Sequence, residues 1–142
     1  MAQNILSEKT EINVRFSEVD SMAIVWHGNY IKFFEDGREA FGRKYGISYM
    51  DIKSQGFMAP LIDMKCQFKK VIKYGDKVYV KTTFRNTSAA KIIYEFEIRS
   101  SETDELLTSG ETTQVFMTFD GELHLTIPKF FSDWKKKWGY ID

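Results

Sequence analysis

One segment of this chain has apolar residues at helical spacing, while the other patterned segments alternate with period two, and this contrast constrains the fold most. Between positions 30 and 45, apolar or small residues recur at intervals of three and four: Tyr30, Phe33, Phe34, Gly37, Phe41 and Tyr45. This spacing predicts one long amphipathic helix. Asn29 is suited to cap its start, and Gly46 to end it in a left-handed conformation. Gly37 and Gly42 should each weaken the helix by about 1 kcal/mol relative to alanine, so we expect close packing against a sheet there.

Alternating apolar residues predict a strand before this helix and several strands after it. The first strand is expected from Ile12 to about Phe16. After Pro60 the alternation continues in four segments, which are marked by Ile62 to Phe68, Val78 to Phe84, Ile92 to Ile98, and a long run through Val115, Met117 and Phe119. Turn residues separate them: Tyr74-Gly75-Asp76, Asn86-Thr87-Ser88, Glu102-Thr103-Asp104, and Asp120-Gly121 before a short return strand.

This inventory predicts an α+β fold in which an antiparallel sheet of five or slightly more strands packs on one long helix. One helix cannot cover such a sheet or protect its edges. We therefore expect at least a dimer that joins or stacks sheets. The length of 142 residues suits a single domain over residues 1–142, with residues 128–142 as a helical C-terminal extension.

Composition excludes several classes of function. The 20 basic residues balance the 20 acidic ones, so no nucleic-acid partner is expected. The single cysteine, Cys66, rules out an intramolecular disulfide framework; it fits a reducing compartment and is expected to be a core thiol. No apolar stretch approaches the roughly 20 residues that cross a bilayer. We therefore expect a cytoplasmic protein without an integral membrane segment.

The run from Arg15 to Glu39 sets one carboxylate, Asp20, just ahead of the helix start. Backbone N–H groups near His27 and Gly28 would point from the helix start toward a bound carbonyl. The apolar residues between Asp20 and the helix would shield it from water, where it could act as base or nucleophile. This arrangement suggests acyl chemistry. A solvated or capping aspartate is the alternative interpretation.

His27 could orient the loop or contact substrate, and these roles are favoured over general acid. A metal-binding role is disfavoured, because the only other histidine is His124 in the terminal hairpin and no Cys or His lies nearby at zinc spacing. The backbone N–H of His27 could stabilise a tetrahedral oxyanion. Removing one such donor typically costs about 100- to 1000-fold in turnover.

These residues carry a resemblance to a known family. The pattern D-x-x-x-x-V-x-H-x-N-Y-x-x-x-F-E is formed by Asp20, Val25, His27, Asn29, Tyr30, Phe34 and Glu35. It resembles the hotdog-fold acyl-CoA thioesterases of the 4-hydroxybenzoyl-CoA thioesterase class, particularly the YbgC-like branch. The likeness extends to about Phe119. Ala23, where many relatives have glycine, and Trp26, where they have tyrosine or phenylalanine, depart from the family pattern.

The resemblance implies a fold, a mechanism and an assembly. If the chain shares the family's fold, its sheet wraps the central helix. Two subunits would then join into a continuous sheet with active sites at the interface, as a homodimer or homotetramer. The residue at Asp20 would attack the thioester or activate water, while the amide at His27 polarises the carbonyl. No cofactor and no metal is implied. Substrate contacts are expected around the loop and helix start: Val25, Trp26, Gly28, Asn29 and Tyr30.

The phosphates of coenzyme A require cations. Arg85 and Lys91 flank a turn where resembling enzymes often carry basic residues, and the cluster Lys69, Lys70 and Lys73 is a further candidate. The segment Trp134–Trp138 places three lysines between two tryptophans and could touch a membrane surface or a nucleotide. A C-terminal helix that docks through its tryptophans is favoured. Glu35 and Arg38 are expected to form an intrahelical ion pair.

The sequence thus predicts hydrolysis of an acyl-CoA to free acid and CoA thiol. Acyl carrier protein could replace coenzyme A as the thiol carrier. Hydratase chemistry, which occurs on related hotdog folds, is disfavoured because the H-F-P-G type signature is absent. A non-catalytic acyl-thioester sensor or assembly factor on the same fold is the third alternative.

Overall fold

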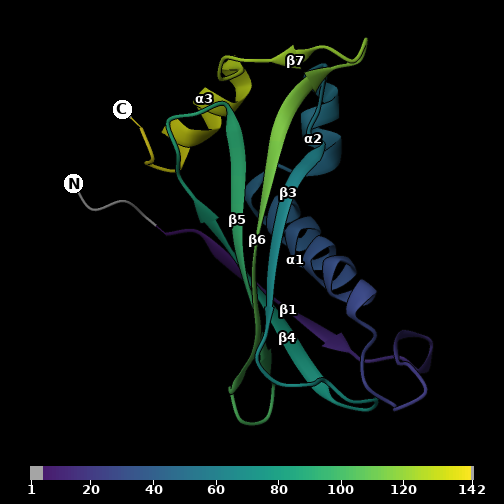
Figure 1. Cartoon of the computed structure of the whole chain (residues 1–142). Helices are drawn as coiled ribbons and strands as arrows, with labels where there is room; N and C mark the ends of the chain where they lie inside the picture. The colour runs from purple at the N-terminus through teal and green to yellow at the C-terminus, as the bar shows by residue number, and fades with distance from the viewer. Residues whose placement is uncertain (1–4, 142) are drawn as a thin grey trace.

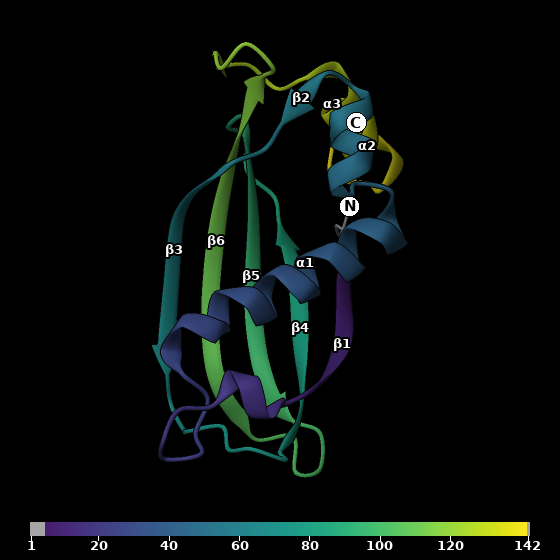
Figure 2. The same cartoon turned by 90° about the vertical axis from the view of Figure 1, so that its right-hand side faces the viewer.

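A seven-stranded antiparallel sheet curves around one long helix in this computed structural model, which describes residues 5–141 (Figures 1 and 2). The five longer strands lie in the order β1-β4-β5-β6-β3, and the short β2 and β7 pair with the far end of β6. The strands are β1 Ser7–Asn13, β2 Phe57–Met58, β3 Leu61–Phe68, β4 Lys77–Arg85, β5 Lys91–Ser100, β6 Leu106–Thr118 and β7 Leu123–His124. The predicted α+β hotdog architecture is confirmed.

The long helix α1, Tyr30–Tyr45, has the predicted bounds. It crosses the sheet diagonally, with its N-terminus toward β3 and its C-terminus toward β1 (Figure 2). The ring of Phe34 stacks on Phe96 of β5 at 4.6 Å between centroids. Gly46 ends the helix with φ 77°, the predicted left-handed conformation. Because α1 lies diagonally, it leaves one corner of the sheet uncovered beside β3 and β6.

The two glycines inside α1 are explained by different contacts. A Cβ on Gly37 would lie 2.4 Å from Oγ1 of Thr82 and 2.9 Å from Cγ1 of Val80, so the predicted close packing against the sheet is confirmed there. A Cβ on Gly42 would instead meet the backbone of the segment after the helix, 2.8 Å from Cα of Ser48. Both positions exclude a side chain.

Two predictions at the start of the fold are wrong. The first strand ends at Asn13, not near Phe16, because the chain turns into a short 3₁₀ segment, Phe16–Glu18, that the Glu18 carboxylate stabilises by accepting the N–H of Arg15 at 2.7 Å. Asn29 does not cap α1. It has helical dihedrals itself, as the last residue of a 3₁₀ turn that precedes the helix, and its side chain makes no capping bond.

A second short helix was not predicted. Helix α2, Tyr49–Ser54, follows α1 and begins with a capping box: Oγ of Ser48 accepts the N–H of Asp51, and Oδ2 of Asp51 accepts the N–H of Ser48. It is followed directly by β2. Together they build a wall at the uncovered corner of the sheet.

The C-terminal helix α3, Lys129–Lys137, docks by its tryptophans as predicted. Nε1 of Trp134 donates to the carbonyl of Tyr45 at 2.7 Å, and Nε1 of Trp138 reaches the same oxygen at 3.2 Å. Lys135 is no free surface cation, since it is 1% exposed and its Nζ donates to the carbonyl of Thr87 at 2.6 Å. Within residues 5–141, no helix has the length and apolarity to span a membrane.

Candidate active site

Asp20 sits at the start of a tight loop that its own backbone closes. The N–H of Asp20 donates to the carbonyl of Ile24 at 2.9 Å, and Oδ1 of Asp20 accepts the N–H of Met22 at 2.8 Å. Ala23 lies within this loop and has φ 60°, a left-handed conformation that a glycine would adopt without strain. The Asp20 side chain is half-buried. One carboxylate oxygen therefore holds the turn, and the other accepts no hydrogen bond from residues 5–141.

The loop is fastened to the segment that follows β3. The N–H of Val25 donates to the carbonyl of Ile72 at 2.7 Å, and the N–H of Tyr74 donates to the carbonyl of Ala23 at 2.9 Å. Ile24 and Lys73 form an isolated β-bridge between these bonds. The backbone of the loop that carries Asp20 is thus held against a second chain segment.

A buried carboxylate, Glu18, organises the other side of the loop. Its Oε1 accepts the N–H of Arg15, and its Oε2 contacts Nζ of Lys32 on α1 at 3.0 Å. Burial by itself would raise the pKa of Glu18, but these hydrogen bonds and charges outweigh burial and lower the pKa below its ordinary value of 4.5. The ionised Glu18 therefore links the loop to the helix.

Asp20 and His27 line the same open pocket of about 270 Å³. The remaining walls are apolar or basic and come from the loop, from α1 and from the end of β3: Ile24, Val25, Tyr30, Phe68, Lys69, Lys70 and Val71. The ring of Tyr30 packs edge-on to Phe68 at 4.7 Å between centroids. The structure thus brings four predicted site residues together: Asp20, Val25, His27 and Tyr30.

The pocket wall at His27 is the start of a helical segment. The 3₁₀ turn His27–Asn29 leads directly into α1, so its first N–H groups have no acceptor within the helix and carry the positive end of its dipole. The ring of Trp26 leans on His27 at 4.9 Å and covers Gly28, where a Cβ would lie 2.0 Å from it. Trp26 and Gly28 therefore shape the helix start and do not line the pocket.

The predicted phosphate-binding cations divide into two groups. Lys69 and Lys70 border the Asp20 pocket, and Lys70 also pairs with Glu105 at 2.6 Å. Arg85 is absent from the pocket lining, and its guanidinium contacts Glu95 at 3.2 Å and Glu111 at 2.5 Å. Lys91, an exposed residue at the start of β5, does not line the pocket either. Arg85 is thus already neutralised by carboxylates.

Some residues of the site were not predicted. The sequence pattern places Phe68 on a strand and gives no role to Val71, because only the fold brings the end of β3 beside the helix start. Glu18 was also missed, although a carboxylate two residues before Asp20 in an otherwise turning segment is a usable signal. His124 lies elsewhere, against the ring of Phe57 at 4.9 Å. Among the described residues, no three His, Cys, Asp or Glu side chains group as metal ligands.

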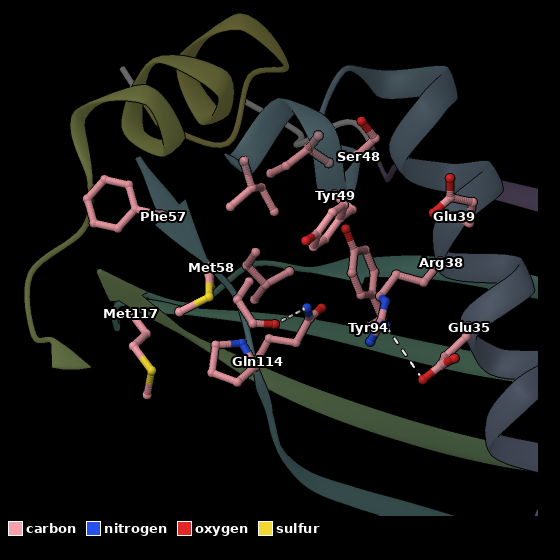
Figure 3. A pocket seen from close by; sticks show the side chains of 15 residues that line it. Glu35, Arg38, Glu39, Ser48, Tyr49, Phe57, Met58, Tyr94, Gln114 and Met117 are labelled. Atoms are coloured by element: carbon pink, nitrogen blue, oxygen red, sulfur yellow. Dashed lines mark hydrogen bonds and ion pairs between the residues drawn. The ribbon is translucent and has the colours of Figure 1, made fainter. Parts of the chain in front are cut away.

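A larger pocket of about 440 Å³ occupies the uncovered corner of the sheet (Figure 3). It lies between the second half of α1, α2, β2 and the strands β5 and β6. Its lining is mainly apolar, with Ile47, Ile52, Phe57, Met58, Ala59, Pro60, Ile92 and Met117, and its polar members include Glu35, Arg38 and Gln114. The predicted pair of Glu35 and Arg38 is present at 4.0 Å.

Asp20 and His27 line one pocket, and the sheet wraps around the helix that follows His27, which is the architecture of the hotdog-fold thioester hydrolases. A model of the Thioesterase-like superfamily matches residues 14–135, and the chain belongs to this family. It is 30% identical to the "Putative acyl-CoA thioesterase YneP" of Bacillus subtilis, over 89% of this chain and 91% of that protein. The predicted family and enzyme class are confirmed.

Solved structures agree with this assignment. The DHNA-CoA thioesterase of Staphylococcus aureus superposes with a TM-score of 0.83 at 34% identity, over 94% of this chain and 89% of that one. A 1,4-dihydroxy-2-naphthoyl-CoA thioesterase from Synechocystis superposes with a TM-score of 0.81 at 20% identity, over 95% and 99% of the two chains. The second likeness concerns the fold alone.

Proposed function

We propose that this protein, an acyl-CoA thioesterase, hydrolyses its substrate with the Asp20 carboxylate and the N–H groups at the start of the helical segment. The observation that carries the proposal is that the half-buried Asp20 and the exposed His27 line one open pocket. A thioester carbonyl between them would have a nucleophile or base on one side and hydrogen-bond donors on the other.

In this mechanism the thioester oxygen accepts a hydrogen bond from the backbone N–H of His27, the residue of the helix start that lines the pocket. Asp20 either attacks the carbonyl carbon or removes a proton from a water that attacks it. The C–S bond then breaks, the thiolate leaves and takes up a proton, and the acid is released after water has supplied its second oxygen. Both routes require an ionised Asp20, so both predict the same response to its neutralisation.

The active form is proposed to be an oligomer built through the free edge of β3. Within residues 5–141, β3 pairs on one side only, with β6. Three large apolar side chains on this strand are exposed: Ile62 56%, Met64 42% and Phe68 56%. Pairing of β3 with a second β3 would extend the sheet and cover them. A homodimer is the smallest such assembly, and a homotetramer would repeat it.

Antiparallel pairing about a two-fold axis has a consequence for the site. The end of β3, which borders the Asp20 pocket, would lie opposite the start of β3 in the second copy. Pro60, which precedes that start, lines the larger pocket. The Asp20 pocket of one subunit and the larger pocket of its partner would therefore become neighbours. Together they would offer room for both the thioester and its acyl group.

The phosphates of coenzyme A need cations near the Asp20 pocket. We propose Lys69 and Lys70 as the cations nearest the coenzyme A phosphates, because they border the Asp20 pocket. Arg85 is a weaker candidate, since Glu95 and Glu111 neutralise it.

We also propose that residues 1–142 form a single domain and that the protein is cytoplasmic. The lone Cys66 is half-buried, and burial raises the pKa of its thiol, which suits an inert side chain in a reducing compartment.

Thiol release from a panel of purified acyl-CoAs tests the proposal. Short, long and aromatic acyl groups would be assayed with a thiol reagent, and the oligomeric state would be measured in the same buffer by light scattering. We expect turnover of at least one member by an oligomer. Binding of acyl-CoA without release of thiol from any member would contradict the proposal and favour a sensor on the same fold.

A further inference from the structure

Large apolar side chains are exposed where two loops meet at one end of the molecule. One loop joins β1 to α1, the other joins β3 to β4, and both lie at the lower end of the sheet in Figures 1 and 2. Four side chains on these loops, which we call the loop patch, are each more than half exposed: Phe16, Met22, Val71 and Tyr74. Exposed apolar side chains grouped in this way usually mark a contact with another molecule.

The loop patch is one surface, because the two loops contact each other directly. The ring of Phe16 packs edge-on against that of Tyr74 at 5.7 Å between centroids. The N–H of Tyr74 donates to the carbonyl of Ala23, the residue after Met22, at 2.9 Å. The fold therefore holds the patch in place. None of its four members belongs to β3, the strand proposed to join subunits.

The exposed charges around the loop patch are positive. Over residues 14–26 and 69–77 the three carboxylates are buried or half-buried, whereas all five basic side chains are exposed: Arg15, Lys69, Lys70, Lys73 and Lys77. Lys70 pairs with Glu105 of a neighbouring turn at 2.6 Å, and the other four form no ion pair among the described residues. The patch is thus surrounded by cations that an anionic partner can reach.

A bilayer that contains anionic lipids complements this combination of side chains. Phenylalanine, methionine and tyrosine enter the boundary between headgroups and acyl chains, while lysine and arginine stay at the phosphates. Each cation near such a surface adds to the attraction. A protein partner suits the patch less well, because a standard protein interface takes about 800 Å² from each side, and the patch is four side chains on two loops.

We propose that the loop patch binds this protein reversibly to the surface of an anionic membrane, with Phe16, Met22 and Tyr74 inserted among the lipids. Val71 of the patch also lines the Asp20 pocket. That pocket would therefore open at the level of the lipid headgroups. The proposal goes beyond the proposed function, since binding to a membrane does not require hydrolysis of a thioester.

Sedimentation of the purified protein with lipid vesicles tests the proposal. We expect partition onto vesicles of phosphatidylcholine mixed with phosphatidylglycerol to exceed that onto phosphatidylcholine alone by about tenfold or more, and to weaken as salt is added. Phe16→Ser and Met22→Ser should each weaken binding by about tenfold, because each removes one inserted side chain. Lys73→Glu should weaken it by about the same factor. Two matched controls should bind like the wild type: Leu125→Ser, just after β7 at the other end of the sheet, and Lys136→Glu on α3.

Several outcomes would overturn membrane binding by the loop patch. Equal partition onto both kinds of vesicle would do so. Binding that Lys73→Glu loses and both serine variants retain would also do so, and would favour an acidic protein as the partner. A serine variant that dissociates in light scattering would assign the patch to a contact between subunits instead. Thiol release is assayed without vesicles, so its absence would contradict the proposed function and leave membrane binding intact.

Discussion

The side-chain amide of Asn29 donates to the backbone carbonyl of Glu18 at 2.8 Å, across the mouth of the loop that carries Asp20. The N–H of Trp26 donates to the same oxygen at 2.9 Å. A carbonyl has two lone pairs, and here both are used to join the beginning of the loop to the start of the helical segment. Asn29 therefore holds the loop that carries the Asp20 carboxylate at a fixed distance from the start of the helical segment.

Replacing Glu18 should loosen the attachment of the Asp20 loop to the helical segment without removing a substrate contact. In Glu18→Gln the acceptor for Arg15 remains, while the charge facing Lys32 is lost. Because Lys32 is half-exposed, we expect the free energy of unfolding to fall by only about 1 kcal/mol at pH 7. kcat should fall more, by about tenfold, since the loop loses its fixed position. Glu102→Gln, in an exposed turn, is the control and should match the wild type.

The same variant should change the pH dependence of stability. The pKa of Glu18 is lowered in the folded protein, so the folded state binds fewer protons at this residue than the unfolded chain. Its contribution is present above the ordinary pKa of 4.5 and is lost as the pH falls through the lowered value. Urea titrations at pH 7 and at stepwise lower pH should therefore show the wild type and Glu18→Gln converging. A gap that widens on acidification would contradict this account.

Gly37→Ala should destabilise the protein, although alanine favours helices by about 1 kcal/mol over glycine. The added methyl would lie 2.4 Å from Oγ1 of Thr82, and forcing it in should cost about 1–3 kcal/mol. Adding Thr82→Ala removes that oxygen, which has no hydrogen-bond partner among the described residues, and should restore part of the loss. Equilibrium unfolding in urea measures both effects. Greater stability of the single variant than of the wild type would refute the close contact.

Local sequence signals predicted the elements whose causes are local. The apolar stripe from Tyr30 to Tyr45 and the glycine at position 46 fixed the bounds of α1, because periodicity and a left-handed cap act within a few residues. The capping role expected of Asn29 failed because a distant carbonyl, that of Glu18, competes for its side chain. Helix α2 was not predicted because its six residues are too few to show a helical spacing of apolar side chains.

The candidate site was predictable only in part, for the same reason. Asp20 and His27 lie close in sequence and belong to a pattern that resembles a family, so the sequence predicts both, and they line one pocket. Phe68 and Val71 line the Asp20 pocket because β3 ends beside the helix start. Gln114 lines the larger pocket because β6, which carries it, pairs with β3. The positions of Arg85 and Lys91 near a turn gave no information about which face of the sheet they occupy.

Met64→Asp should disrupt the proposed assembly. Met64 lies on β3 and is 42% exposed, and a carboxylate there would face its own copy across the two-fold axis. We expect the protein to become monomeric at micromolar concentration and to lose most of its activity while remaining folded by circular dichroism. Leu125→Asp, an equally drastic change at an exposed residue outside β3, should leave the assembly intact. A fully active Met64→Asp monomer would contradict a site shared between subunits.

Asp20→Asn is the most direct test of the central claim, that the carboxylate at position 20 works against the helix start on a bound thioester. Asparagine keeps an oxygen for the N–H of Met22, so the loop should stay folded and only the charge is removed. With the best acyl-CoA of the panel, kcat is expected to fall by about 100- to 10,000-fold, with KM and melting temperature little changed. An Asp20→Asn protein that releases thiol at the wild-type rate would contradict the account.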